Sequence, residues 1–188
     1  MRHKYATQSI VLARTPLGES SALIALLTPD LGLVYARAQG VRQSGAKLAS
    51  ALATFAESMT TLVRGREGWR LTGAVLGRNW YLALESASSA QRAARVAGLM
   101  QRLSAQEACD PALFSIFLNL LQTLSWAPAI LHEAAEILAS LQALAALGLD
   151  SGELPTVEPT SISTLEHIAQ ERVTYVARIN RGISASGL

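Results

Sequence analysis

The 188-residue chain has little of what redox, metal or membrane proteins usually need. It contains one cysteine, Cys109, so no internal disulfide can form and nothing indicates an oxidising compartment. It has three histidines, and aromatic residues make up only 5% of it. No apolar run reaches the roughly 20 residues that a membrane helix needs. The first residues lead into an alternating, strand-like segment and not into the apolar core of a signal peptide. We therefore expect a cytoplasmic protein with no membrane association, no metal and no cofactor.

Motifs that carry catalysis are also missing. His132-Glu133-Ala134-Ala135-Glu136 resembles the start of a zinc-protease helix, but Glu136 stands where the second histidine is required. Residues 65–68, Gly-Arg-Glu-Gly, lack the Lys-Ser/Thr of a phosphate-binding loop. Cys109 has no evident histidine partner and is interpreted as a passive thiol. A small hydrolase or transferase is thus the weakest hypothesis, and we expect no enzymatic activity and no small-molecule substrate.

Charge is unevenly distributed along the chain. Residues 1–80 carry ten Lys/Arg and four acids, a net charge of +6, whereas residues 81–188 carry six Lys/Arg and ten acids, a net charge of −4. Small imbalances of this kind are common. A basic module joined to an acidic one also fits the pattern, and such a basic module suits a polyanionic partner.

The N-terminal part of the chain, up to about residue 80, has the pattern of a small β-barrel. Short runs that are apolar or alternate in polarity are separated by turns rich in Gly and Pro, and one stretch, 46–55, has apolar residues at helical spacing. The strands are expected at 7–14, 20–28, 33–39, 59–64 and 69–75. Five strands with a helix between the third and fourth is the order of an OB-fold barrel.

Beyond residue 80 the pattern becomes helical. Helices are expected over 88–103, from Asp110-Pro111 onward, from about 130 to Gly148, and from a capping box at Ser163 and Glu166 to about Gly182. Residues 149–160 are expected to form a linker. The sequence therefore predicts an α+β protein. A five-stranded OB-fold barrel over 1–78 is followed by an α-helical bundle domain over 79–188.

Several segments of this N-terminal part resemble the RecO family of bacterial recombination mediators. Their order and spacing carry the resemblance, which continues more loosely to a Leu-Gly step at Leu147-Gly148. The segments are Ile10-Val11-Leu12, Leu17-Gly18-Glu19-Ser20-Ser21, Leu26-Leu27-Thr28-Pro29-Asp30-Leu31-Gly32, Ala38-Gln39-Gly40-Val41-Arg42, Lys47-Leu48 and the aromatic Phe55.

The resemblance implies a DNA repair and homologous recombination mediator. Such a protein binds single-stranded DNA, anneals complementary strands and helps to load recombinase onto DNA coated by single-stranded-DNA-binding protein. The implied partners are that coating protein, through its acidic tail, and RecR. The chain departs from the family in two respects. It is short, and residues 150–160 contain no cysteine where many members carry a four-cysteine zinc module.

The candidate DNA-binding residues are the basic side chains of the barrel half. They follow the third predicted strand and surround the hairpin at 65–68, where OB-folds bind oligonucleotides. The set is Arg37, Arg42, Lys47, Arg64, Arg66 and Arg70, with Tyr35 as a stacking residue and Trp69 as a weaker candidate. In the alternative interpretation the arginines only solvate the barrel and the two aromatics belong to its core.

A second candidate surface lies on the first long helix. Arg92, Arg95 and Arg102 fall within about 80° of one another at 100° per residue. They form either a solvated face or a docking site for the acidic tail of single-stranded-DNA-binding protein. The competing hypothesis for the whole chain is an adaptor whose barrel and bundle hold protein partners and bind no nucleic acid.

Overall fold

The computed structural model describes residues 3–39, 47–104, 110–155 and 160–187. These residues divide into two compact units. One contains the described residues of 3–83 together with 110–114, and the other contains 84–104, 115–155 and 160–187. Each unit is described by itself below.

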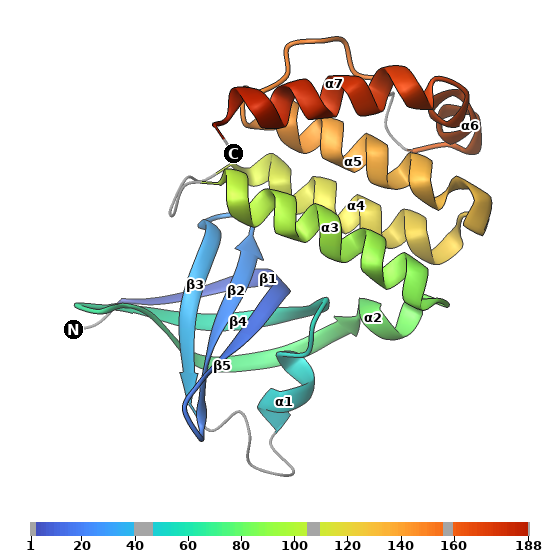
Figure 1. Cartoon of the computed structure of the whole chain (residues 1–188). Coiled ribbons are helices and arrows are strands. Elements are labelled where there is room, and N and C mark those ends of the chain that lie inside the picture. The colour runs from blue at the N-terminus through green and yellow to red at the C-terminus, as the bar shows by residue number, and fades with distance from the viewer. Residues whose placement is uncertain (1–2, 40–46, 105–109, 156–159, 188) are drawn as a thin grey trace. The chain divides into compact units, whose positions relative to one another are not determined.

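Five strands form a closed barrel in the order β1-β2-β3-β5-β4 (Figure 1). Their bounds are β1 Lys4–Leu17, β2 Ser21–Thr28, β3 Gly32–Gln39, β4 Ala56–Gly65 and β5 Gly68–Asn79. All neighbouring pairs are antiparallel except β3 and β5, which run parallel. This is the OB-fold arrangement, so the predicted fold class is confirmed for the barrel. β1, β4 and β5 are clearly longer than the sequence pattern indicated, because exposed residues such as Lys4 and Arg78 continue the hydrogen-bonded ladder beyond the apolar run.

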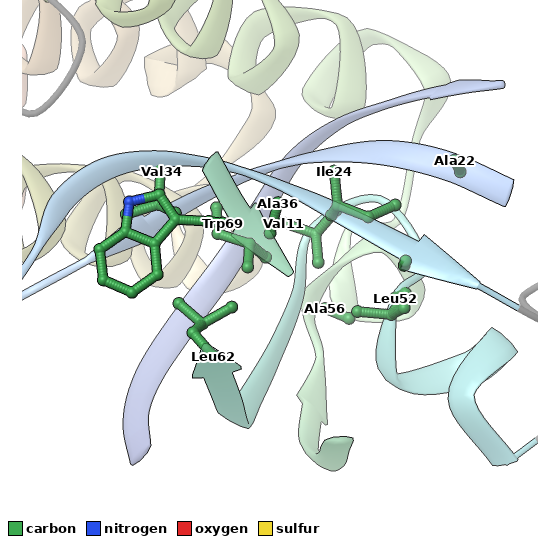
Figure 2. Packing of buried hydrophobic residues seen from close by; sticks show 11 residues of the cluster. Val11, Ala22, Ile24, Val34, Ala36, Leu52, Ala56, Leu62 and Trp69 are labelled. Carbon is green, nitrogen blue, oxygen red and sulfur yellow. The ribbon is translucent and has the colours of Figure 1, made fainter. Parts of the chain in front are cut away.

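Apolar side chains fill the barrel interior (Figure 2). Ile24, Leu26 and Leu62 are completely buried, and Leu52 reaches the same cluster from the segment that joins β3 to β4. β3 and β4 alternate buried residues with partly or fully exposed ones over part of their length, as a half-buried strand should. Closure of the barrel pairs the strand edges with one another and so protects them from pairing with other chains.

The predicted helix at 46–55 is shorter than expected. Helix α1 covers Lys47–Ala51, and the chain then turns so that Phe55 has a φ of 60°. A bulky side chain rarely adopts this left-handed conformation. Here the Phe55 amide donates to the Val11 carbonyl at 2.8 Å, and the Phe55 carbonyl accepts from the Trp80 amide. The ring is 1% exposed, so burial and two backbone hydrogen bonds hold the unusual geometry.

The second unit is a helical bundle, which confirms the other half of the predicted fold class. Its long helices are α3 Ala87–Leu103, α4 Pro111–Trp126 from residue 115 onward, α5 His132–Ala146, α6 Ile162–Gln170 and α7 Arg172–Ala185. A short α2, Trp80–Ala83, follows the barrel, and a 3-10 turn, η1 Ala129–Leu131, precedes α5. Helix α5 contacts α3, α6 and α7 and is the central helix of the bundle (Figure 1).

Two details of the C-terminal region differ from the sequence prediction. The expected single helix from Ser163 is two helices, because the backbone breaks at Glu171 between α6 and α7. The N-cap is Ser161 and not Ser163, because the Ser161 hydroxyl accepts from the Thr164 amide at 3.2 Å. No Gly or Pro marks the break, and the apolar residues keep the same helical spacing on both sides of it. The sequence therefore contains no signal for the break.

One stretch of the described chain, Ala129–Ala146, is long and apolar enough to cross a membrane, with a mean hydropathy of 1.2. Within the bundle, 61% of it is buried. A mostly buried core helix passes the same test of length and composition, so this stretch is weak evidence for a membrane span.

Candidate nucleic-acid interface

The β4–β5 hairpin presents two charged residues at its tip. Gly65 pairs with Gly68, so only Arg66 and Glu67 lie in the turn. Gly68 has a φ of 99°, a conformation that glycine adopts without steric cost, and this lets β5 return directly beside β4. Arg66 and Glu67 are therefore exposed on a short, well-defined turn.

The parallel contact between β3 and β5 brings residues from distant parts of the sequence together. Ala36 pairs with Trp69, and Arg37 pairs with Arg70. Ala36 and Trp69 are buried in the barrel, whereas Arg37 and Arg70 are both exposed. Because side chains alternate between the two faces of a strand, the two arginines share the outer face.

A surface groove of about 1090 Å³ lies where β3 and the β4–β5 hairpin meet. It gathers four of the predicted DNA-binding residues, Arg37, Arg64, Arg66 and Arg70, although they come from three strands and one turn. The remaining lining residues are Gln39, Gly65, Glu67, Gly68, Leu71 and Thr72. The groove thus has four positive side chains and one acidic side chain.

The charges of the groove are only partly neutralised. Arg37 approaches Glu67 at 3.5 Å, and both side chains are well exposed, at 58% and 85%. Exposed pairs of this kind contribute about 0–1 kcal/mol and exchange readily with other anions. Arg66 and Arg70 make no ion pair with any residue that the structure describes. An anion that follows the groove therefore meets an excess of positive charge.

The two aromatic residues that the sequence offered for base stacking differ in burial. Trp69 is 8% exposed and belongs to the barrel core, as the alternative interpretation had it. The Arg64 guanidinium lies 5.4 Å from the centre of the Trp69 ring. Tyr35 is half-buried and lines a smaller neighbouring pocket of about 230 Å³ with Arg37 and Trp69. Its stacking role stays a prediction.

Sequence reasoning missed a third aromatic residue at this end of the barrel. Tyr5 is 39% exposed, and its ring meets Trp69 edge to face with a centroid distance of 5.2 Å. The pairing of β1 with β4, which places Tyr5 opposite Leu62, brings it there. Only the barrel closure reveals this neighbour, because Tyr5 lies in the first strand and Trp69 in the last.

Two predicted DNA-binding residues cannot be placed in the groove. Arg42 lies outside the described residues. Lys47 begins α1, but its side chain is not among those described. Both stay predictions.

The three arginines of α3 are not equivalent. Glu136 of α5 receives hydrogen bonds from Arg92 at 2.7 Å and from Arg95 at 2.5 and 2.7 Å. These bonds raise the pKa of Arg95 above its ordinary value, with hydrogen bonding to Glu136 as the main cause. Arg102 is exposed and makes no ion pair within the described part of the chain. Arg92 and Arg95 therefore join α3 to α5, and the docking role of all three stays untested.

The contacts of His132 indicate a structural role. It is buried, its Nε2 donates to the Ala127 carbonyl at 2.8 Å, and its Nδ1 lies 3.1 Å from the Ser89 hydroxyl. Both ring nitrogens are thus occupied by neighbouring groups. Among residues 3–39, 47–104, 110–155 and 160–187, no three His, Cys, Asp or Glu side chains converge as metal ligands would.

Comparison with known proteins agrees with the barrel. The family model described as "Recombination protein O N terminal" matches residues 1–78. The chain belongs to the RecO family. A protein named "DNA repair protein RecO" from Dehalococcoides mccartyi is 32% identical over 122 residues, which cover 65% of this chain and 48% of that relative. Its namesake from Gloeobacter violaceus is 31% identical over 161 residues, 85% of this chain and 59% of the relative.

A RecO protein of Synechococcus elongatus is 46% identical over a shorter stretch of 55 residues. The matched part of this chain spans about half the length of the relatives from Dehalococcoides and Gloeobacter. The likeness to RecO proteins therefore covers the barrel throughout and the helical unit in part.

Proposed function

We propose that this RecO-family chain acts in DNA repair and recombination by binding single-stranded DNA in the groove between β3 and the β4–β5 hairpin. The observation that carries the proposal is the convergence of Arg37, Arg64, Arg66 and Arg70 on one groove of an OB-fold barrel. OB-folds bind oligonucleotides on the β2–β3 face and the adjoining loops, and this groove includes β3 and the loop between β4 and β5.

The groove chemistry favours binding without base sequence preference. Arginine binds phosphate oxygens with charge and paired hydrogen bonds, and phosphates are the same at every nucleotide. Binding should release counterions, so affinity should fall with salt by a slope of roughly −0.7 per phosphate contacted by a single strand.

The test is fluorescence anisotropy with a labelled oligonucleotide across a salt series. The variant Arg66→Ala/Arg70→Ala removes two groove charges. The control Arg102→Ala/Arg181→Ala removes two exposed charges from α3 and α7. The groove variant should bind more weakly with a flatter slope, and the control should match the unmodified protein. Equal loss in both variants would mean that net charge and not the groove governs binding. No binding by the unmodified protein at low salt would refute the proposal.

The proposal also includes the more specific activities that membership of the family implies. We infer annealing of complementary strands, assistance in loading recombinase, and contacts with RecR and with the acidic tail of single-stranded-DNA-binding protein. Relatives named as repair proteins support this role, and the positive charge of the groove supports DNA binding there. Annealing is tested with two complementary oligonucleotides coated by that protein. The chain should accelerate duplex formation, and the groove variant should lose the acceleration.

A non-enzymatic protein fits the same observations. The groove residues are arginines, glycines and one exposed acid, with Gln39, Leu71 and Thr72, and none of them is a nucleophile beside a base. The adaptor hypothesis predicts that oligonucleotide binding is absent while protein partners still bind. The anisotropy experiment therefore separates the two.

A further inference from the structure

The N-terminal end of β1 lies at the edge of the arginine groove. Lys4 pairs with Val63 and Tyr5 pairs with Leu62, so these residues lie beside the part of β4 that leads to Arg64. Val63 in turn pairs with Arg70 of β5. The start of β1 therefore lies beside the strand that carries Arg64 and one strand further from Arg70, and both arginines line the groove.

The aromatic residues of the barrel unit differ in how much ring surface they offer. Phe55, Trp69 and Trp80 are 1%, 8% and 2% exposed, which leaves too little ring face for a nucleotide base. Tyr81 is 52% exposed but follows the far end of β5, well beyond the groove residue Leu71. At roughly 3.3 Å per strand residue this places it far from the groove. Tyr35 is half-buried. Tyr5, 39% exposed, offers more surface and contacts Trp69, over which the groove residue Arg64 lies.

Trp69 fixes the position of Tyr5. The two rings meet nearly perpendicularly, at 79°, and Trp69 is itself held in the barrel cluster beside Leu62 (Figure 2). Edge-to-face contact is a favoured geometry for aromatic pairs and restricts the orientation of the exposed ring. A ring that is already ordered loses little conformational entropy when a base stacks on it.

Positive charge lies beside this aromatic pair. The Arg64 guanidinium, which also lines the groove, lies 5.4 Å from the centre of the Trp69 ring. Proteins that bind single strands combine such charges, which contact phosphates, with aromatic rings on which bases stack. We propose that Tyr5 is a base-stacking residue of this interface, ordered by Trp69 and close to the charge of Arg64.

This inference rests on the proposed function. A comparison of two ligands separates an error in the stacking proposal from an error in the proposed function. One is an oligothymidylate, and the other is an oligonucleotide of the same length whose residues are all abasic. Both carry the same phosphates, but only the first can stack. We expect the unmodified protein to bind the oligothymidylate at least about fivefold more tightly, because stacking on one aromatic residue typically gives that factor or more.

Variants of Tyr5 show whether that preference comes from its ring. Tyr5→Leu should bind both ligands alike, at the affinity of the abasic one, whereas Tyr5→Phe should keep the preference. Equal binding of both ligands by the unmodified protein would overturn the stacking proposal and leave the proposed function intact. If Tyr5→Leu still bound the oligothymidylate more tightly than the abasic oligonucleotide, the stacking proposal would be wrong, and Tyr5 would only cover Trp69. Binding of neither ligand would refute the proposed function itself.

A second measurement needs no variant and covers the case in which Tyr5→Leu does not fold. Irradiation of the unmodified protein with an oligonucleotide that contains 5-iodouracil cross-links stacked aromatic residues. After trypsin digestion the cross-link should map to the peptide of residues 5–14. Cross-links that map only to peptides with Tyr35 or Trp69 would overturn the inference.

Discussion

Arg37 of β3 and Arg70 of β5 are paired in register across the parallel contact that closes the barrel. Two like charges side by side on neighbouring strands destabilise a sheet, by a few tenths to about 1 kcal/mol. Glu67 offsets the charge of Arg37, but Arg70 has no ion-pair partner among the described residues. A charge pair that costs stability is expected where a surface binds a polyanion, as proposed above.

The first prediction separates the two effects of Arg70. Arg70→Thr puts a residue with good strand propensity in place of the charge. The variant should be as stable as the unmodified protein or more stable by up to about 1 kcal/mol, because the repulsion from Arg37 is gone. Its salt slope for oligonucleotide binding should be lower by about 0.7. Urea unfolding and an anisotropy salt series measure the two quantities. Loss of stability with unchanged DNA binding would show that Arg70 serves the barrel alone.

The second prediction concerns the acidic residue of the groove. Glu67 lies 3.5 Å from Arg37 and competes with phosphate for it. Glu67→Gln keeps the size of the side chain and removes its charge, so DNA should bind more tightly at low salt. The gain should be within about fivefold, because exposed pairs are worth at most about 1 kcal/mol. It should shrink as salt rises. Glu85→Gln, at an exposed acid outside the groove, is the matched control.

The sequence predicted the barrel better than the residues that gather at its surface. Apolar alternation and turn residues indicated all five strands, because these signals are local. The register that sets Arg37 beside Arg70 depends on closure between β3 and β5, which are separated in the chain by α1 and β4, and no local pattern encodes it. The same holds for Tyr5, whose neighbour Trp69 is distant in sequence.

The α3 arginines show a second kind of information that a sequence pattern lacks. Arg92 and Arg95 do share a helix face, since both contact Glu136, but a spacing cannot show which helix packs against that face. Glu136 of α5 supplies that information, because it binds both Arg92 and Arg95. The break at Glu171 was missed for a related reason, since the apolar positions on either side of it continue the same period.

The third prediction follows from the bonds to Glu136. Arg95→Glu should place two carboxylates together and lower the melting temperature by about 2–6 °C, if the cost is about 1–2 kcal/mol. Oligonucleotide binding should not change, because the groove is in the other unit. Arg102→Glu is the comparison, since its exposed side chain makes no ion pair in the described structure, and it should leave the melting temperature unchanged. If this helix face binds an acidic peptide, Arg102→Glu should weaken peptide binding while the protein remains fully folded. A melting temperature unaffected by Arg95→Glu would show that the Glu136 contacts contribute no stability.

The last prediction is a dependence of stability on pH that comes from Asp150. Arg178 of α7 donates to both carboxylate oxygens of Asp150, with 2.7 Å between Arg178 Nε and Asp150 Oδ1, and its Nη1 donates to the Glu153 carbonyl at 2.7 Å. The two side chains are 13% and 9% exposed. The hydrogen bonds from Arg178 are the main reason why the pKa of Asp150 lies below its ordinary value of 3.8, and they outweigh the effect of burial.

A lowered pKa means that the unfolded chain takes up a proton on Asp150 at a higher pH than the folded chain does. The stabilisation is therefore complete above about pH 5 and is lost as pH falls below 3.8 and through the folded pKa. Asp150→Asn should lower the free energy of unfolding at pH 7 by about 1–3 kcal/mol, the usual range for hydrogen bonds to a charged group. At pH 3 the difference between the variant and the unmodified protein should be smaller. Gly152→Ala should have a similar effect at pH 7 by another route, since a Cβ there would lie 2.5 Å from the Arg178 guanidinium and displace it. Urea unfolding at pH 7, 5, 4 and 3 measures all three proteins, and a difference that stayed constant over this range would show that the charge of Asp150 does not contribute.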